Sequence, residues 1–235
     1  MPPRSDLGRP PGTFDLGHRV RRPGQGGREP NPRLGRLHPR PRHGRGHTLD
    51  VLQHLLGGIS DLSATLSLQH PVSTVAETGE MVEATSPDHL LLNATLVNGA
   101  VVSAHIHDAK RTDARTRLEI SGTTADLAIV STAAGGPAGI QIGELRLLGT
   151  DASDATWREL PIPSRYRWIS GIDPAEESFN VAQTYARLAL DLRTGSRGVP
   201  GFDAGLRLHR LLDAIRLSAE TGTRRSAFGE SEYRN

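Results

Sequence analysis

The amino-acid sequence divides sharply near Gly46, and this division most limits what the chain can fold into. Residues 1 to 46 hold 11 Arg, 9 Pro and 9 Gly, with few large apolar side chains. Such a stretch cannot bury enough apolar surface to offset the conformational entropy lost on ordering. We therefore expect a disordered basic leader over residues 1–45 and one folded domain over residues 46–235.

The charge follows the same division. The whole chain has a formal net charge of +2, but residues 1 to 46 carry +8 and the remainder carries −6. The part expected to fold is thus mildly acidic. The arginines of the leader are therefore weak evidence for a nucleic-acid partner, which we do not expect.

Three interpretations of the leader stay open. It could be an arm that contacts nucleic-acid phosphates, although it lacks the aromatic side chains that usually accompany such arms. It could be a plain disordered tail. We favour the third, out-of-frame translation of a GC-rich gene, because the chain has one Lys among its 28 basic residues. Sequencing the locus distinguishes the third interpretation from the other two.

The chain contains no cysteine, which excludes a disulfide framework and a thiolate nucleophile. A reducing compartment, the cytoplasm, is the simplest expectation. No apolar run approaches the roughly 18 to 20 residues that cross a bilayer, so we expect no membrane association.

Helical and strand patterns are clear after Gly46. A helix is predicted over 47–56 and a half-buried strand over 59–70. Asn98-Gly99 between two strand-like runs predicts a hairpin with a two-residue type I′ turn. Further alternating runs lie at 115–122, 125–131, 140–149 and 157–163.

Two long helices are predicted near the end of the chain, one capped by Asp173 and ending at Gly195, the other running from Asp203 to Gly222. Successive strands without helices between them favour antiparallel pairing. The predicted fold class is α+β, an open, mostly antiparallel sheet of roughly five to seven strands with helices packed on one face.

Asp50 and His54 stand four residues apart on the first predicted helix and therefore share a face. An imidazole accepts a proton near neutral pH, and a nearby carboxylate orients it, so the pair fits acid–base chemistry. A surface pair on an amphipathic helix is the alternative, because this spacing alone is a weak pattern.

The segments GHTLDVLQHLLG, NVAQTYARLALDLRTG and HRLLDAIRLSAETG resemble the second domain of Gfo/Idh/MocA oxidoreductases, and among them members related to the Gal80 sugar sensor. This resemblance implies a domain that contacts a sugar or polyol, often forms a homo-oligomer through its sheet face, and follows a Rossmann domain that binds NAD or NADP. It implies two alternative functions, part of a dehydrogenase or a non-catalytic sensing module.

The family motif Gly-Gly-x-x-x-Asp-x-x-x-His maps onto Arg45, Gly46, Asp50 and His54, with the first glycine replaced. The resemblance implies that His54 accepts a proton from a substrate hydroxyl as hydride leaves for nicotinamide. Asp50 would orient His54 or contact the substrate, and His47 would be a further substrate contact.

Two sequence features that the resemblance implies for a complete enzyme are not found. No Gly-x-Gly-x-x-Gly sequence follows a predicted strand and opens a helix, and the catalytic lysine of a Glu-Lys-Pro motif is absent. The single lysine, Lys110, fits a solvated turn. We expect the chain to be a truncated substrate half that binds no cofactor and is inactive alone.

Two further groups are candidate substrate contacts. His105 and His107 project from one face of a strand, where they would line a substrate cleft or an oligomer contact; with Asp108 they rarely form a metal site without a remote ligand, so we expect no metal. Tyr166 and Trp168 lie near Trp157 among arginines, a pattern typical of sugar stacking, an interface or packing at the rim of the core.

Overall fold

The computed structural model describes residues 44–74, 78–107, 116–131, 140–141, 145–151, 153–176 and 178–227. The leader predicted over residues 1–45 lies outside this part except for its last two residues, and so do Asp108 and Lys110. The first helix begins at Gly44, close to the predicted start of the domain. Within the described residues, no helix is both long and apolar enough to cross a membrane.

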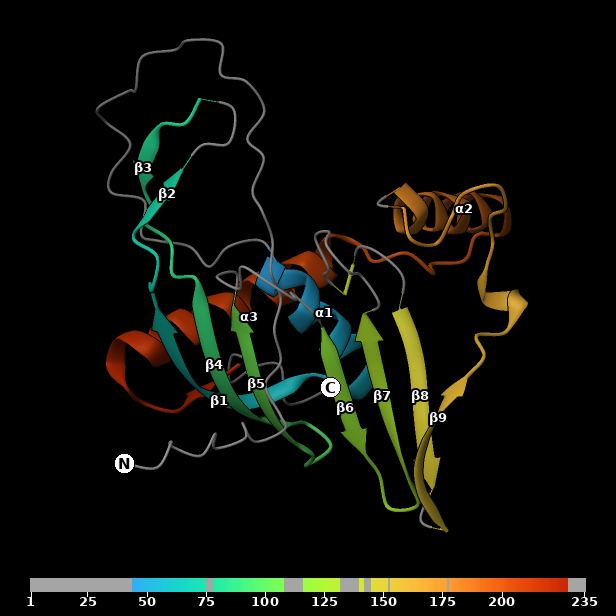
Figure 1. The fold of residues 1–235 in the computed structure, drawn as a ribbon, viewed down its shortest axis with the longest axis horizontal. Coiled ribbons are helices and arrows are strands. Elements are labelled where there is room, and N and C mark those ends of the chain that lie inside the picture. Colours follow the sequence, from blue (N-terminus) through green and yellow to red (C-terminus); the bar gives the residue numbers. More distant parts are fainter. Residues whose placement is uncertain are drawn as a thin grey trace, which may run out of the picture.

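A four-stranded antiparallel sheet carries two helices on one face and lies beside a second four-stranded sheet (Figure 1). Its strand order is β10-β1-β4-β5. The strands are β1 (Ile59–Ser67), β4 (His89–Leu96), β5 (Val101–His107) and β10 (Arg225–Ser226), and the helices are α1 (Gly44–Leu56) and α3 (Phe202–Thr221).

The hydrophobic core lies between this sheet and the two helices. Alternation along β4 turns every second side chain toward the helices, so Leu90 and Leu92 are buried whereas Leu91 is 49% exposed. The other apolar side chains that are less than one-twentieth exposed in this cluster are Leu49, Leu52, Ile59, Leu62, Leu96, Ile106, Leu211 and Ile215. The opposite face of the sheet carries the alternate residues of β4 and β5.

The remaining strands form two further antiparallel groups. A second four-stranded sheet has the order β6-β7-β8-β9, and β2 pairs with β3 in a short ribbon. Their bounds are β2 (Val72–Thr74), β3 (Met81–Glu83), β6 (Arg117–Ser121), β7 (Ala125–Ser131), β8 (Leu145–Asp151) and β9 (Asp154–Leu160). The α+β class is confirmed, but the strands form two four-stranded sheets and a ribbon instead of one larger sheet.

The β4–β5 hairpin is confirmed with a different turn. Gly99 N donates to Leu96 O at 2.9 Å, Leu96 N donates to Ala100 O at 2.8 Å, and Gly99 has a positive φ of 88°. This is the pattern of a three-residue loop with glycine in the left-handed position. The predicted two-residue turn is wrong, and the pairing register therefore shifts by one residue.

The two late helices differ in how well they pack. Helix α3 ends at Gly222, whose φ is 65°, as predicted. Helix α2 (Ser178–Thr194) begins after the predicted start, because Asp173 caps a separate turn through Ala175 N. In Figure 1, α2 is drawn beyond the upper end of β8, apart from β1 and β4.

The apolar side chains of α2 are not covered, although the predicted fold packs the helices on one sheet face. Val181 is 57% exposed, Tyr185 67% and Leu192 79%. Among the described residues of this helix only Asp191 is buried. The prediction of helices packed on one sheet face therefore holds for α1 and α3.

Candidate functional site

Helix α1 presents a polar face to solvent. His47, Asp50 and His54 are all exposed, whereas Leu49 and Leu52 on the opposite side are buried in the core. The spacings of three and four residues place the three polar side chains on one face of the helix. The structure therefore brings together three of the six predicted site residues.

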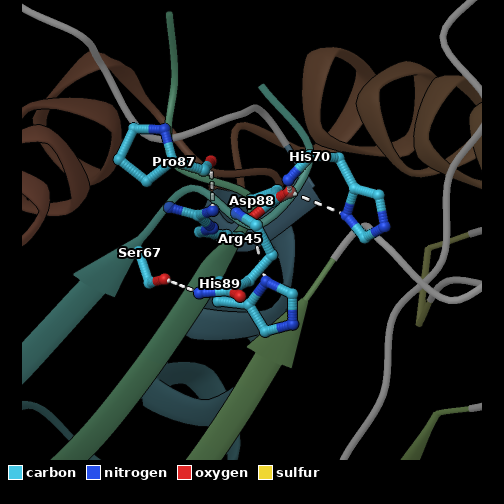
Figure 2. Close-up of polar contacts among 7 residues, drawn as sticks. Arg45, Ser67, His70, Pro87, Asp88 and His89 are labelled. Carbon is cyan, nitrogen blue, oxygen red and sulfur yellow. Dashed lines mark hydrogen bonds and ion pairs between the residues drawn. The ribbon is translucent and has the colours of Figure 1, made fainter. Parts of the chain in front are cut away.

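Both ends of α1 are fixed by the chain on either side of β4. At the helix start, the fully buried Arg45 donates from Nη2 to Pro87 O, just before β4 (Figure 2). At the helix end, Asn98 Nδ2 donates to Leu56 O at 3.1 Å. These two contacts hold the helix along β4, so the polar face has a defined position on the molecule.

The contact expected between Asp50 and His54 is not formed. In the described part of the chain, no hydrogen bond or ion pair links the Asp50 carboxylate to the His54 ring. Both side chains are open to solvent. A hydroxyl-bearing ligand on this face would thus have access to an imidazole and a carboxylate at once.

A buried carboxylate organises a second polar cluster at the start of β4 (Figure 2). Asp88, 2% exposed, accepts hydrogen bonds from Gln69 N and His70 N, each at 2.8 Å. Its oxygens also lie 3.1 Å from His70 Nδ1 and 2.8 Å from His89 Nδ1. A carboxylate only accepts hydrogen bonds, so both ring nitrogens act as donors.

These hydrogen bonds decide the charge of Asp88. Burial of the carboxyl alone raises its pKa, but the bonds from Gln69, His89 and His70 outweigh burial and hold the pKa far below its ordinary value. Asp88 is therefore a fixed anion at neutral pH.

Three imidazoles lie together beside Asp88. The ring centroids of His89 and His107 are 4.9 Å apart, those of His105 and His107 4.6 Å, and those of His89 and His105 5.6 Å. Burial of the His105 ring, followed by the nearby His89, lowers the pKa of His105. Burial therefore favours the neutral form of His105.

His105 does not lie with the polar face of α1. Its neighbour Ile106 is buried in the core under the helices, and side chains alternate along a strand. His105, His89 and His107 therefore lie on the sheet face turned away from α1. The predicted substrate role of His105 stays a prediction, but the fold does not place it beside His54.

Tyr166 and Trp168 form a third location near α2. They are 54% and 51% exposed, and Gln183 holds the segment, accepting from Trp168 N at 2.8 Å and donating to Tyr166 O at 2.9 Å. The Arg165 guanidinium lies 4.8 Å from the Tyr166 ring and that of Arg187 5.7 Å from the Trp168 ring. The exposed rings and cations are typical of a stacking surface.

Sequence reasoning missed Asp88 and His89. Asp88 falls between the strand predicted over 59–70 and the predicted hairpin, and nothing in that part of the sequence indicated a buried carboxylate. His89 could have been found only with a three-residue loop in the hairpin, which pairs it directly with His107. The two-residue turn predicted from Asn98-Gly99 would have paired it with Asp108.

Residues 44–131 match the family model described as Gal80p, C-terminal domain. No curated protein matches the chain in sequence. The transcriptional regulator Gal80p from Kluyveromyces lactis is similar in structure, with 25% identity and a TM-score of 0.59 over 79% of this chain and 46% of that one.

Two solved oxidoreductases share the fold. An oxidoreductase domain protein from Kribbella flavida is 18% identical, with a TM-score of 0.60 over 79% of this chain and 50% of that one. Levoglucosan dehydrogenase is 22% identical, with a TM-score of 0.57 over 79% and 50%, and is also known in complex with NADH and L-sorbose. The chain thus spans about half the length of the structures it matches.

Proposed function

We propose that the chain is a Gal80-like domain of the oxidoreductase type and that the polar face of α1 is its sugar- or polyol-contacting surface; the match of residues 44–131 to the model of the Gal80p C-terminal domain supports this. One observation supports this most: His47, Asp50 and His54 are exposed together on a helix whose opposite side is in the core. Because the helix is fixed at both ends, these exposed polar groups keep defined positions and can bind a specific ligand.

Each residue has a chemical role in this proposal. His54 accepts the proton of a substrate hydroxyl, because a neutral imidazole is a competent base near neutral pH. Asp50 accepts a hydrogen bond from a neighbouring hydroxyl of the same ligand, and His47 contacts its far side. Tyr166 and Trp168 would stack against the sugar only if the ligand extends toward α2, so their role stays a separate proposal.

The described residues do not fit a dinucleotide such as NAD or NADP. Every strand pair in the described part of the chain is antiparallel, whereas dinucleotide sites are built on parallel strands joined through a glycine-rich turn. The sequence Gly44-Arg45-Gly46 opens α1 with a buried arginine. Oxidation of a substrate would need cofactor-binding residues outside the described part, and we infer that the chain alone is inactive.

A sensing module is the second candidate. It rests on the matching family model, which is that of the Gal80p C-terminal domain. In that case the same helix face binds a ligand or a protein partner without chemistry. The cytoplasmic location stays a prediction from the absence of cysteine in the sequence.

One kinetic experiment separates the two candidates. The full chain is joined to the amino-terminal half of a similar oxidoreductase, and NADH formation is followed with sugars and polyols. Loss of a general base lowers kcat by about 10²–10⁴-fold, which we expect for His54→Ala but not for His209→Ala, an exposed histidine on α3. If the unmodified fusion protein and its His54→Ala variant both bind sugar but neither forms NADH, the result would support the sensor and contradict the enzyme.

A further inference from the structure

We propose that the exposed apolar row of α2 binds the same row of a second copy of this chain, so that the two helices form an antiparallel pair. The row consists of Val181, Tyr185, Leu188 and Leu192, each more than one-third exposed. This surface is separate from the polar face of α1, and the proposal does not depend on the proposed function.

The spacing along the row is that of a seam between two helices. Val181, Tyr185, Leu188 and Leu192 follow one another at intervals of four, three and four residues. Large apolar side chains at such alternating intervals form one narrow line on a helix and interlock with an equivalent line on a neighbouring helix. A helix that covers a sheet or a core has a wider apolar face. The spacing therefore favours another helix as the occupant.

The chain itself occupies a different, polar side of α2. Asn180 Nδ2 donates to Gln141 O at 3.0 Å, and Gln183 Oε1 accepts from Trp168 N at 2.8 Å. The Arg187 guanidinium lies 5.7 Å from the Trp168 ring. Asn180, Gln183 and Arg187 are three and four residues apart and so share one side of the helix. The polar side thus contacts the same chain, and the apolar row is left as an interaction surface.

Small side chains flank the row. Ala182, Thr184 and Ala189 lie beside it on the helix surface. The remaining flanking side chain, Asp191, is 6% exposed and accepts hydrogen bonds from the loop that follows the helix. Two copies can therefore approach closely without placing like charges side by side along the seam.

The charges at the two ends of α2 favour an antiparallel pair. Asp173 and Glu176 lie just before the helix, Arg193 lies in its last turn and Arg197 just beyond it, and all four are exposed. A parallel pair would bring the carboxylates of both copies together. An antiparallel pair places the carboxylates of each copy beside the guanidiniums of the other, which is the complementary arrangement.

Two-fold symmetry fixes which residues meet. In such a contact the same surface of both copies is used, so Tyr185 of one copy faces Leu188 of the other, and Val181 faces Leu192. The Val181 side chains of the two copies then lie about 16 Å apart along the helix axis. Stable interfaces involve about 20–30 residues a side, and this seam is smaller. We therefore expect a weak pair that forms at high protein concentration.

Disulfide trapping in the full chain tests the pair, because the chain contains no cysteine. Val181→Cys protein and Leu192→Cys protein are mixed at high concentration and oxidised, and linked dimers are measured on denaturing gels without reductant. We expect the mixture to form linked dimers and Val181→Cys protein alone to stay unlinked, because 16 Å exceeds the reach of a disulfide. The matched control is Leu190→Cys, 39% exposed on the opposite side of α2, which should not link to Leu192→Cys protein.

A charge exchange tests the orientation. Arg197→Glu in both proteins should lower the linked fraction by about 2–5-fold, because exposed ion pairs contribute little, and Glu176→Arg added to the same chains should restore it. Self-linkage of Val181→Cys protein, equal linkage of the control, or no linkage in the mixture would overturn the proposal. In the last case, protection of the row after the amino-terminal half of a similar oxidoreductase is joined to the chain would identify that half as the occupant.

Discussion

At the scale of single residues, the Asp191 carboxylate closes the loop that follows α2. Its Oδ1 accepts from Ser196 Oγ at 2.6 Å, and its Oδ2 accepts from Gly198 N and Val199 N at 2.6 and 2.9 Å. The hydrogen bond from Ser196 lowers the pKa of Asp191; burial opposes this, and the two amides and Arg187 lower it further. The loop therefore depends on an ionised carboxylate.

This dependence predicts a pH effect. A carboxyl whose pKa is lower in the folded state stabilises the fold above its unfolded pKa, and the contribution is lost as pH falls through the folded value. Asp191→Asn should lower the thermal midpoint at neutral pH, and the difference from wild type should shrink below about pH 4. Asp213→Asn, an exposed carboxylate on α3, is the control. A constant difference across this range would contradict the role of the charge.

Single residues also limited what the sequence could predict. The hairpin at Asn98-Gly99 was predictable, but its register was not, because Asn98 Nδ2 binds Leu56 O and Val97 N binds Gly58 O. These contacts with the end of α1 accompany the longer loop. Likewise, the sequence showed only that Arg45 replaces the first glycine of the family motif. In the structure its side chain is buried and donates a hydrogen bond to Pro87 O. Both depend on partners more than 35 residues away.

At the scale of elements, burial of one apolar side holds α1 in position. Leu49 is fully buried in the core cluster, which also includes residues of the sheet and of α3, whereas Leu55 on the same helix is 46% exposed. Periodicity alone predicted this helix, because its leucines recur at helical spacing. The sequence does not distinguish the two leucines, and only the packing shows that they should contribute differently to the free energy of unfolding.

Truncation of these two leucines should therefore have unequal effects. Leu49→Ala should lower the free energy of unfolding by about 2–5 kcal/mol, because it leaves a cavity in the core. Leu55→Ala should cost less than about 1 kcal/mol. Urea unfolding followed by circular dichroism measures both. Equal losses would show that α1 does not pack on the sheet as described.

At the scale of the whole molecule, the sheet face opposite α1 and α3 is open at Val101 and Leu91, among the described residues. Val101 is 84% exposed and Leu91 49%, and both lie on this face by strand alternation. Antiparallel sheets covered on one side need water or a partner on the other. The fold class was predictable from successive strands, but the division into two sheets was not, because it depends on pairing between strands.

This open face is where we expect a homo-oligomer. Leu91→Ser combined with Val101→Ser should shift the chain from a dimer or larger assembly toward a monomer, measured by light scattering after size-exclusion chromatography. Leu55→Ser removes a similarly exposed leucine on α1 and should leave the mass unchanged. A monomeric wild type, or an unchanged mass for the double variant, would contradict an interface on this face.

The central claim is that the polar face of α1 binds a sugar or polyol, and an NMR titration of the full chain tests it most directly. L-sorbose, the sugar bound by levoglucosan dehydrogenase, and a panel of polyols are added to ¹⁵N-labelled protein. We predict saturable shifts at His47, Asp50 and His54 that His54→Ala weakens and His209→Ala does not. Saturable shifts confined to other residues, or none with any sugar or polyol of the panel, would contradict the claim.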